Sequence, residues 1–280
     1  MPNLAYYEKK VLSDKVLPVQ LAVNEADGCR EIFPVHWHEH LEMHYILSGG
    51  GTFHIDQQLY HVQAGDLIIA NRSEMHAGYS TATPYKAWLL VFDPADVAGG
   101  LLEDNARFQS HIRGDETVRG LIGRMMEEHS RGAEGYDHLC RALVTELLVY
   151  LSRNYRTETL SLRSVTKRRR DLERLAPVLR YIEQNYAEPI AVGQLAGMLC
   201  LSTDRMGHLF HEGVGLSPLQ YINEIRLRKA MSLLTTGEYT VTEVALAVGF
   251  ADYNHFGRLF RRRYGCTPNQ VRRGKVEEPQ

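Results

Sequence analysis

The chain has few cysteines, the residues whose disulfide bonds or metal sites stabilise many small or secreted proteins. Its 280 residues include four cysteines, Cys29, Cys140, Cys200 and Cys266, which lie far apart and form no Cys-x-x-Cys pair. This spacing argues against a zinc ribbon and a secreted disulfide framework, so we expect reduced thiols. A signal sequence is lacking, as is any apolar run of roughly 18 residues that could span a membrane. We therefore expect a cytoplasmic protein without a membrane span.

The net charge of -2 conceals two parts of opposite sign. Residues 1–159 carry 14 Lys and Arg against 22 Asp and Glu, whereas residues 160–275 carry 18 against 10. A basic part joined to an acidic part predicts that one end of the chain meets a polyanion and the other has a different task. The length also allows two domains, each with its own core.

The pattern of apolar residues changes near residue 100. Residues 30–92 combine short alternating runs with Gly- and Asp-containing turns, which predicts a small β-barrel or sandwich. Helical spacing follows at Val118–Met126 and at Leu139–Leu151. These segments predict two antiparallel helices, whose apolar stripes either pack within the chain or form a dimer interface. The polar, basic segment 157–171 is predicted to be a linker.

An internal repeat of about 50 residues occupies the C-terminal third. Val192–Leu201 returns as Val241–Phe250, and each copy continues into a Leu-Phe pair and a Gly-x-Ser/Thr-Pro segment. Each copy predicts a helix, a tight turn and a second helix, with Ser202 and Asp252 as the N-caps of the second helices. This is the pattern of a helix-turn-helix, whose second helix enters the major groove of DNA.

The outward positions of the second helices are the candidate DNA contacts. Asn pairs bidentately with adenine and Arg with guanine, so Asn254 and Arg258 are the strongest candidates for base reading. The run Arg261–Arg263 is predicted to contact phosphates. Gly207 and Gly257, at equivalent places, fit either a close approach to DNA or a tolerated glycine. The predicted DNA-contacting residues are Thr203, Asp204, Arg205, His208, Tyr253, Asn254, Arg258 and Arg261.

Three segments within residues 172–275 match a family signature. Ile225–Ala230, Val244–Phe250 and Phe256–Arg261 resemble the DNA-binding domain of the AraC/XylS transcription regulators. The resemblance implies seven helices, two helix-turn-helix units joined by one long helix, and usually transcriptional activation. It also implies RNA polymerase as a partner.

The stretch from His36 to His44 places four histidines and two carboxylates in nine residues. The N-terminal half resembles the cupin-type effector domains attached to many members of that family. The ligand positions of the cupin motif are matched by His36, His38, Glu42 and His76, although several turn positions of the motif differ. On a strand, His36 and His38 point the same way.

Three interpretations of these residues stay open. Three imidazoles and a carboxylate suit one divalent transition metal such as zinc, iron, manganese or nickel. A metal-free pocket for a sugar or related metabolite would use His36, His38, Glu42 and His76 as hydrogen-bonding walls, with Tyr45 or Trp88 as a stacking surface. A merely structural cluster is the third interpretation.

The competing class of protein is an enzyme, a metal-dependent cupin oxygenase or isomerase. It would leave about a hundred C-terminal residues without a purpose, so we predict a regulator and not an enzyme. We expect an α+β protein of two domains: a cupin-type β-barrel that senses an effector (1–100) with a helical pair that forms a homodimer (101–156), then a linker (157–171) and an all-α tandem helix-turn-helix domain that binds promoter DNA (172–275).

Overall fold

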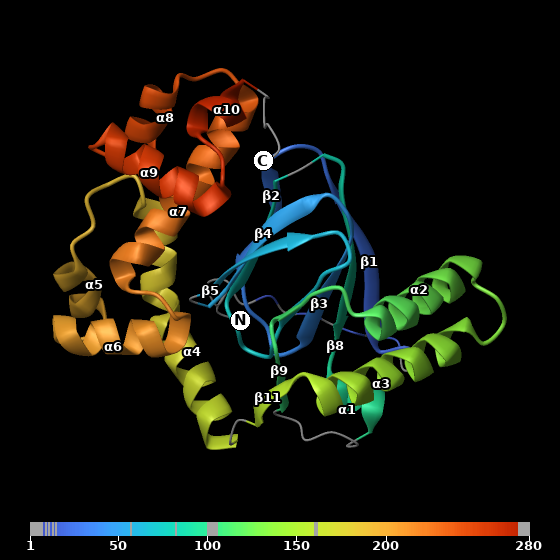
Figure 1. Cartoon of the computed structure of the whole chain (residues 1–280). Coiled ribbons are helices and arrows are strands. Elements are labelled where there is room, and N and C mark those ends of the chain that lie inside the picture. Colours follow the sequence, from blue (N-terminus) through green and yellow to red (C-terminus); the bar gives the residue numbers. More distant parts are fainter. Residues whose placement is uncertain are drawn as a thin grey trace.

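The computed structural model describes residues 8, 10, 12, 14, 16–56, 58–81, 83–99, 106–159 and 162–273. A β-rich domain precedes a helical domain, in agreement with the predicted α+β class (Figure 1). The predicted junction at residues 100 and 101 lies outside the described residues. None of the helices in the described ranges is long and apolar enough to cross a membrane.

Two antiparallel sheets form the β domain. One sheet has the order β1-β8-β3-β6-β10 and consists of Val19–Ala26, Tyr85–Phe92, Leu41–Ser48, Leu67–Ala70 and His111–Ile112. The other has the order β2-β7-β4-β5 and consists of Arg30–His36, His76–Ser80, Gly50–Ile55 and Gln58–Gln63. Apolar side chains such as Ile46, Phe53 and Ile68 pack between them. A further ladder pairs β9 (Ala106–Phe108) with β11 (Arg156–Thr159).

A short helix, α1 (Pro94–Ala98), and the hairpin of α2 (Glu116–Arg131) and α3 (Tyr136–Asn154) cover the five-stranded sheet. Asp115 caps α2, and Gly132 ends it in the left-handed conformation, at the predicted break. The predicted stripes are buried against the sheet, with Leu139 42% exposed as the exception among the leucines of α3. The apolar stripes therefore pack within the chain, which is the first of the two interpretations given above.

Seven helices form the C-terminal domain of the described residues, the number that the resemblance implies. They are α4 (Leu162–Asn185), α5 (Val192–Met198), α6 (Thr203–Val214), α7 (Pro218–Thr236), α8 (Val241–Ala247), α9 (Tyr253–Tyr264) and α10 (Pro268–Arg272). The segment 157–171, which we predicted as a linker, holds most of β11 and the first turns of α4. Regular structure extends into it because β11 pairs with β9, and because α4 continues upstream from its buried face at Leu172 and Leu175.

The outer face of the four-stranded sheet packs against the helical domain. Ala77 and Tyr79 of β7 join the apolar core of α7 to α10, and Trp37 and Met75 join the core of α4 to α7. The helical domain thus lies on one side of the β domain and the α2–α3 hairpin on the other (Figure 1). Both helix-turn-helix units consequently share an apolar boundary with the same sheet.

Candidate functional site

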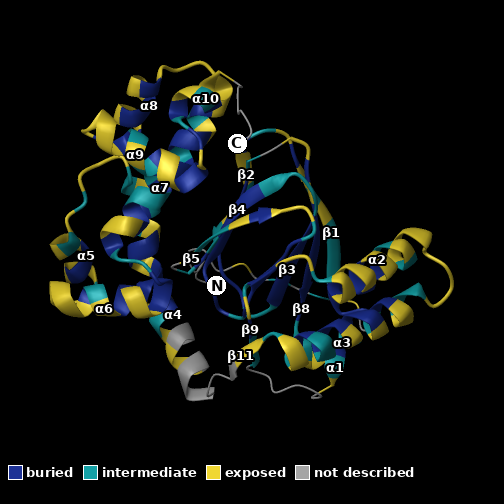
Figure 2. Cartoon of the chain, in the orientation of Figure 1, coloured by how far each residue is buried: buried dark blue, intermediate teal, exposed yellow. Residues whose placement is uncertain are grey.

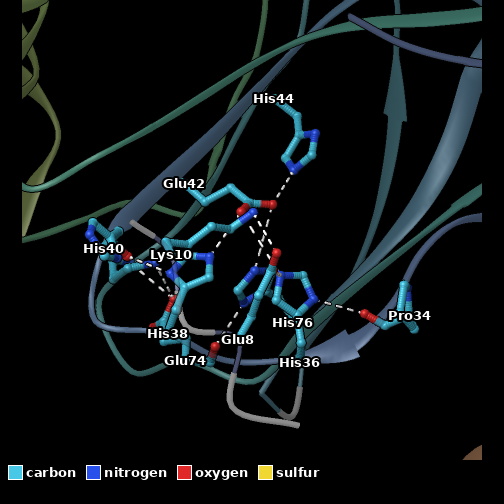
Figure 3. A network of polar contacts seen from close by, with 11 residues as sticks. Glu8, Lys10, Pro34, His36, His38, His40, Glu42, His44, Glu74 and His76 are labelled. Atoms are coloured by element: carbon cyan, nitrogen blue, oxygen red, sulfur yellow. Dashed lines mark hydrogen bonds and ion pairs between the residues drawn. The ribbon is translucent and has the colours of Figure 1, made fainter. Parts of the chain in front are cut away.

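Three histidines and one glutamate meet inside the β domain (Figure 3). His36 ends β2, His38 lies in the following loop, Glu42 lies on β3, and His76 begins β7. One possible ligand atom from each residue lies within 4.8 Å of the others, and all four residues are buried. The structure thus brings together the four residues that the sequence suggested as metal or effector ligands.

A backbone carbonyl orients each of the three imidazoles. Nδ1 lies 2.9 Å from the Pro34 oxygen in His36, 3.2 Å from the His40 oxygen in His38, and 2.8 Å from the Glu74 oxygen in His76. A carbonyl oxygen can only accept, so a neutral ring that donates to it carries its hydrogen on Nδ1. Each Nε2 then presents its lone pair to the cluster, as in metal-binding histidines held by an outer acceptor.

Each of these rings also faces a carboxylate at Nε2. The distance to Glu42 Oε2 is 2.9 Å from His38, that to Glu42 Oε1 is 3.6 Å from His76, and that to Glu8 Oε2 is 3.1 Å from His36. A neutral imidazole has one N–H and cannot satisfy acceptors on both sides. The acceptor at Nε2 has a favourable partner only if the ring is cationic, with a second N–H, or if a metal ion is bound at Nε2.

The charges in the cluster are set by burial and by the neighbouring rings. Burial alone would raise the pKa of the Glu42 carboxyl, but hydrogen bonds with His38, His44 and His76 hold this pKa well below its usual value. Burial lowers the pKa of His38 to about 4. An ionised carboxylate therefore lies among imidazoles, of which His38 is neutral at pH 7. Such a donor set can bind a divalent metal ion.

His44 is a member of this network that sequence reasoning left outside the motif. Its Nε2 lies 2.7 Å from Glu42 Oε1, and its ring stacks on Phe33 with the centroids 4.8 Å apart. Period 2 along β3 was the available signal, because Glu42 and His44 lie two residues apart on the same face. His44 positions Glu42.

A cavity of about 920 Å³ lies beside the cluster and between the two domains. His36 and Glu42 contribute to its wall in the β domain, and Glu183 of α4 contributes from the helical domain. The long helix α7 adds Arg228, Lys229, Ser232 and Thr235. The volume suits a small organic molecule, and most of these side chains can form hydrogen bonds. Sequence reasoning missed the α7 residues, since they lie about 190 positions from His36 in the chain.

Tyr45 and Trp88, which we predicted as stacking surfaces for an effector, do not reach this site. Both belong to the core between the five-stranded sheet and the α2–α3 hairpin, and they pair across β3 and β8. Tyr45 lies three positions from Glu42, so it points to the opposite face of the sheet. The prediction of these two aromatics as effector contacts is therefore wrong in this structure.

The helix-turn-helix pattern follows from local capping. Ser202 accepts a hydrogen bond from the Arg205 amide at the start of α6, and Asp252 accepts two at the start of α9. Gly215 and Gly265 end these helices in the left-handed conformation. Both predicted N-caps are confirmed, and the two second helices have the same length of 12 residues.

The predicted DNA contacts are exposed on α6 and α9 (Figure 2). On α6 these residues are Thr203, Asp204, Arg205 and His208, and on α9 they are Tyr253, Asn254, Arg258 and Arg261. Meanwhile Met206, Phe210, Phe256 and Phe260 are fully buried, so the opposite faces hold the helices in the core. The exposed side chains are thus free of the packing that fixes each helix.

Arg263 differs from the other residues of the arginine run. We predicted that Arg261–Arg263 contacts phosphate, but Arg263 is only 3% exposed. Its Nε lies 2.6 Å from Glu224 Oε2, and its guanidinium lies 4.5 Å from the centre of the Tyr79 ring. The helical period places it on the inner face of α9, three residues after Phe260. Arg263 holds the domain boundary and is unavailable to DNA.

Comparisons with known proteins agree with this division. A family model described as the AraC-like ligand binding domain matches residues 18–148, and a helix-turn-helix domain model matches residues 195–274. The HTH-type transcriptional activator RhaS of Escherichia fergusonii is 31% identical over 256 residues, which cover 87% of this chain and 88% of that protein. The chain belongs to the AraC family of transcription regulators.

Other relatives of this AraC-family chain extend over similar lengths. The RhaS activator of Salmonella arizonae is 28% identical over 263 residues and matches 89% of this chain and 90% of that protein. Among solved structures, ToxT from Vibrio cholerae gives a TM-score of 0.42 at 14% identity, over 91% of this chain and 96% of that chain. As a family member the chain is a DNA-binding transcription regulator with an effector domain, and it is not an enzyme.

Proposed function

We propose that this regulator activates transcription when a small molecule, a sugar or a related metabolite, occupies the cavity between its domains. One observation carries the proposal: His36 and Glu42 line one side of the cavity, and α7, the helix that separates the two DNA-binding units, lines the other. A polyhydroxylated ligand suits this cavity, because amide, hydroxyl, carboxylate and cationic groups line it. The relatives named activators support the direction of the response.

A ligand in this cavity would act through differential affinity. It contacts residues of both domains, so it binds most tightly to the domain arrangement that brings the two walls to the right separation. The same coupling requires promoter DNA and ligand to change each other's affinity by an equal factor. Apart from the linker at 157–171, the predicted division into an effector domain, a helical pair and a DNA-binding domain stays part of this proposal. Helix α7 is the element that would link the ligand to the spacing of the two recognition helices.

The proposed metal is one divalent transition ion held by His36, His38, Glu42 and His76. Support comes from the three rings, because each turns Nδ1 to a backbone carbonyl and Nε2 toward the cluster, where a metal would bind. Bound there, the ion would supply a positive centre for a hydroxyl or carboxylate of the effector. The protein's own residues fix the ring orientations and shield the centre from bulk water.

Sequence-specific DNA binding is assigned mainly to α9. Asn254 and Arg258 are exposed on one face and carry the side chains that discriminate adenine and guanine. Thr203, Asp204, Arg205 and His208 of α6 and Tyr253 and Arg261 of α9 complete the proposed contact set.

The proposed partners beyond DNA and effector are RNA polymerase and a second copy of the chain. Since the apolar stripes of α2 and α3 are buried in the chain's own core, a dimer through this hairpin would use its outer face, which exposes Leu139. We propose the cytoplasm as the site of action, because the proposed promoter DNA would be bound there.

The test uses the full chain and measures its melting temperature with a chelator and with a panel of divalent metals and sugars. A ligand at 100 times its dissociation constant adds about 2.7 kcal/mol of stability. We expect chelation to lower the melting temperature, one metal to restore it, and His76→Ala to remove this response. His61→Ala is the matched control, because His61 is exposed on β5 and away from the cluster.

The same panel separates the alternatives. If chelation has no effect while one sugar stabilises the chain, the histidines bind the effector without metal. If neither metal nor any sugar changes the melting temperature or the affinity for a promoter fragment, the cluster is structural and the proposed effector site is wrong.

A further inference from the structure

Two cysteines that are distant in the sequence meet at the boundary between the domains. Cys29 lies in the turn between β1 and β2, and Cys266 lies in the turn between α9 and α10. Their Sγ atoms are 3.8 Å apart, although the residues are separated by 237 positions. Their exposed fractions are 6% and 5%. Each domain therefore contributes one thiol to a single buried contact.

The other two cysteines provide an internal comparison. The Sγ of Cys140 is buried between α2 and α3 and contacts the Met125 carbonyl oxygen at 3.8 Å. Cys200 is exposed in the turn of the first helix-turn-helix unit. In the described part of the chain, the one contact between two thiols is therefore the contact that joins the domains.

We propose that Cys29 and Cys266 form a reversible disulfide that joins the β domain to the second helix-turn-helix unit. A disulfide bond is about 2.05 Å long, so the sulfurs must approach by roughly 1.8 Å from their present separation. Both residues lie in turns, where a rotation about χ1 and a small backbone shift are easier than within a strand or helix. The bond would connect the turn that precedes β2 directly to the turn that follows α9.

The reactive partner on the protein side is Cys29. Either thiol can be the donor in their contact, which lowers the pKa of Cys29 and raises that of Cys266. The thiolate is the nucleophile in thiol–disulfide exchange, so Cys29 attacks first. Since both sulfurs are buried, an oxidant reaches Cys29 only when the boundary opens locally.

The co-reactant is a low-molecular-weight disulfide such as glutathione disulfide. The Cys29 thiolate attacks one sulfur of this molecule, which forms a Cys29–glutathione mixed disulfide and releases one glutathione thiolate. The Cys266 thiol then loses its proton, and its sulfur attacks that of Cys29. This step forms the Cys29–Cys266 bond, breaks the mixed disulfide and releases the second glutathione. Two protein thiols lose two electrons and two protons, and glutathione disulfide becomes two glutathione thiols.

The bond would have a direct conformational effect. The β domain contacts both helix-turn-helix units through apolar residues, and these contacts are not covalent. A covalent bond beside α9 keeps that part of the boundary closed while the disulfide persists. Disulfides in reducing compartments are commonly transient and redox-sensing, which is compatible with free thiols under ordinary conditions.

The experiment incubates the unaltered full chain in buffers of graded glutathione disulfide to glutathione ratio, followed by alkylation and tryptic mass spectrometry. We expect a cross-linked pair of peptides, residues 16–30 with residues 264–272, within one molecule. The oxidised chain should migrate faster without reductant and melt several degrees higher than the reduced chain, because the bond closes a long loop. Dithiothreitol should reverse all three changes.

Single substitutions supply the controls. Cys29→Ser and Cys266→Ser should each abolish the cross-link and the rise in melting temperature, whereas Cys200→Ser should leave both intact. The proposal is overturned if alkylation finds Cys29 and Cys266 free under conditions that modify Cys200. A cross-link found solely between different molecules overturns it equally. Because the decisive measurement uses the unaltered chain, a variant that fails to fold does not affect the result.

Discussion

The two helix-turn-helix units share one backbone plan and differ in what their second helices expose. Residues of α6 and α9 correspond at a spacing of 50, from Thr203 and Tyr253 onward. Along α6 the formal charge comes from Asp204, Arg205 and Glu212, whereas α9 exposes three arginines, Arg258, Arg261 and Arg262, and has no acid. The first unit therefore offers a nearly neutral face and the second a strongly cationic one. A duplicated fold can thus divide its work, with the second copy supplying most of the attraction to DNA.

Corresponding positions also differ on the inner faces of these helices. Arg263 of α9 corresponds to Gly213 of α6, where an added Cβ would lie 2.8 Å from Leu175 Cδ1. The first unit uses a small residue so that α4 can approach closely. The second unit uses a buried cation that pairs with Glu224 and lies over Tyr79 of the β domain. The second unit is consequently held to α7 by an ion pair and to the β domain by a cation–π contact and apolar packing.

The largest expected effect concerns that buried cation. Arg263→Ala should lower the free energy of unfolding by about 3–5 kcal/mol, because it leaves the Glu224 carboxylate without its partner. Urea unfolding of the full chain measures the change. The neighbouring exposed Arg262→Ala should change stability by less than about 0.5 kcal/mol. Equal losses in the two variants would contradict the role of Arg263 at the domain boundary.

A smaller effect is expected at the base-reading positions. Asn254→Ala and Arg258→Ala should each lower operator affinity by about 1–3 kcal/mol and relax the preference for one base pair. The matched variants of the first unit, Asp204→Ala and His208→Ala, should have weaker effects. Competition binding against operators with single base changes gives the measurement. If all four variants weaken every sequence alike, the division of labour between the units is wrong.

The glycines at equivalent places provide a third comparison. An added Cβ at Gly207 or Gly257 would meet nothing within 4 Å, so alanine should stabilise each helix by about 1 kcal/mol. If DNA approaches α9 more closely than α6, Gly257→Ala should also weaken operator binding while Gly207→Ala has little effect. Thermal unfolding and binding are measured on the same samples. If operator binding is unchanged in both variants, the two glycines are merely tolerated and do not serve a close approach to DNA.

The smallest expected effect is on the salt dependence of binding. Each phosphate contact contributes about 0.9 to the slope of log affinity against log salt concentration. Arg261→Ala should reduce the slope by roughly that amount. The corresponding change in the first unit, His211→Ala, should leave the slope unchanged. If His211→Ala reduces the slope and Arg261→Ala does not, the first unit contacts phosphate and the proposed difference between the units is wrong.

Features that depend on neighbours in sequence were predicted correctly. The repeat and its N-caps Ser202 and Asp252 follow from local capping and helical spacing, and the seven helices were implied by the family resemblance. The ligand set His36, His38, Glu42 and His76 was identified through its motif, and the structure brings these residues together. The error at Tyr45 was avoidable, because strict alternation from Glu42 assigns it to the other face.

Features that depend on the docking of one domain against the other were not predicted. The cavity wall on α7, the burial of Arg263 and the contact of Cys29 with Cys266 all join segments far apart in the chain. Local patterns carry no information on such contacts. Arg263 illustrates the limit: helical spacing from Phe260 assigns it to the inner face of α9, but nothing local indicates that Tyr79 of the β domain covers it there.

The helix α7 has three neighbours along its length, and this restricts how the protein can change over evolution. One face supplies Ser232 and Thr235 to the cavity, while Ile225 and Leu234 belong to the cores of the first and second DNA-binding units. A lineage that acquires a new effector must alter the first face without disturbing the others. In the proposed mechanism, ligand preference and the spacing of the DNA half-sites are therefore inherited together on one helix, and a change in either is limited by the other.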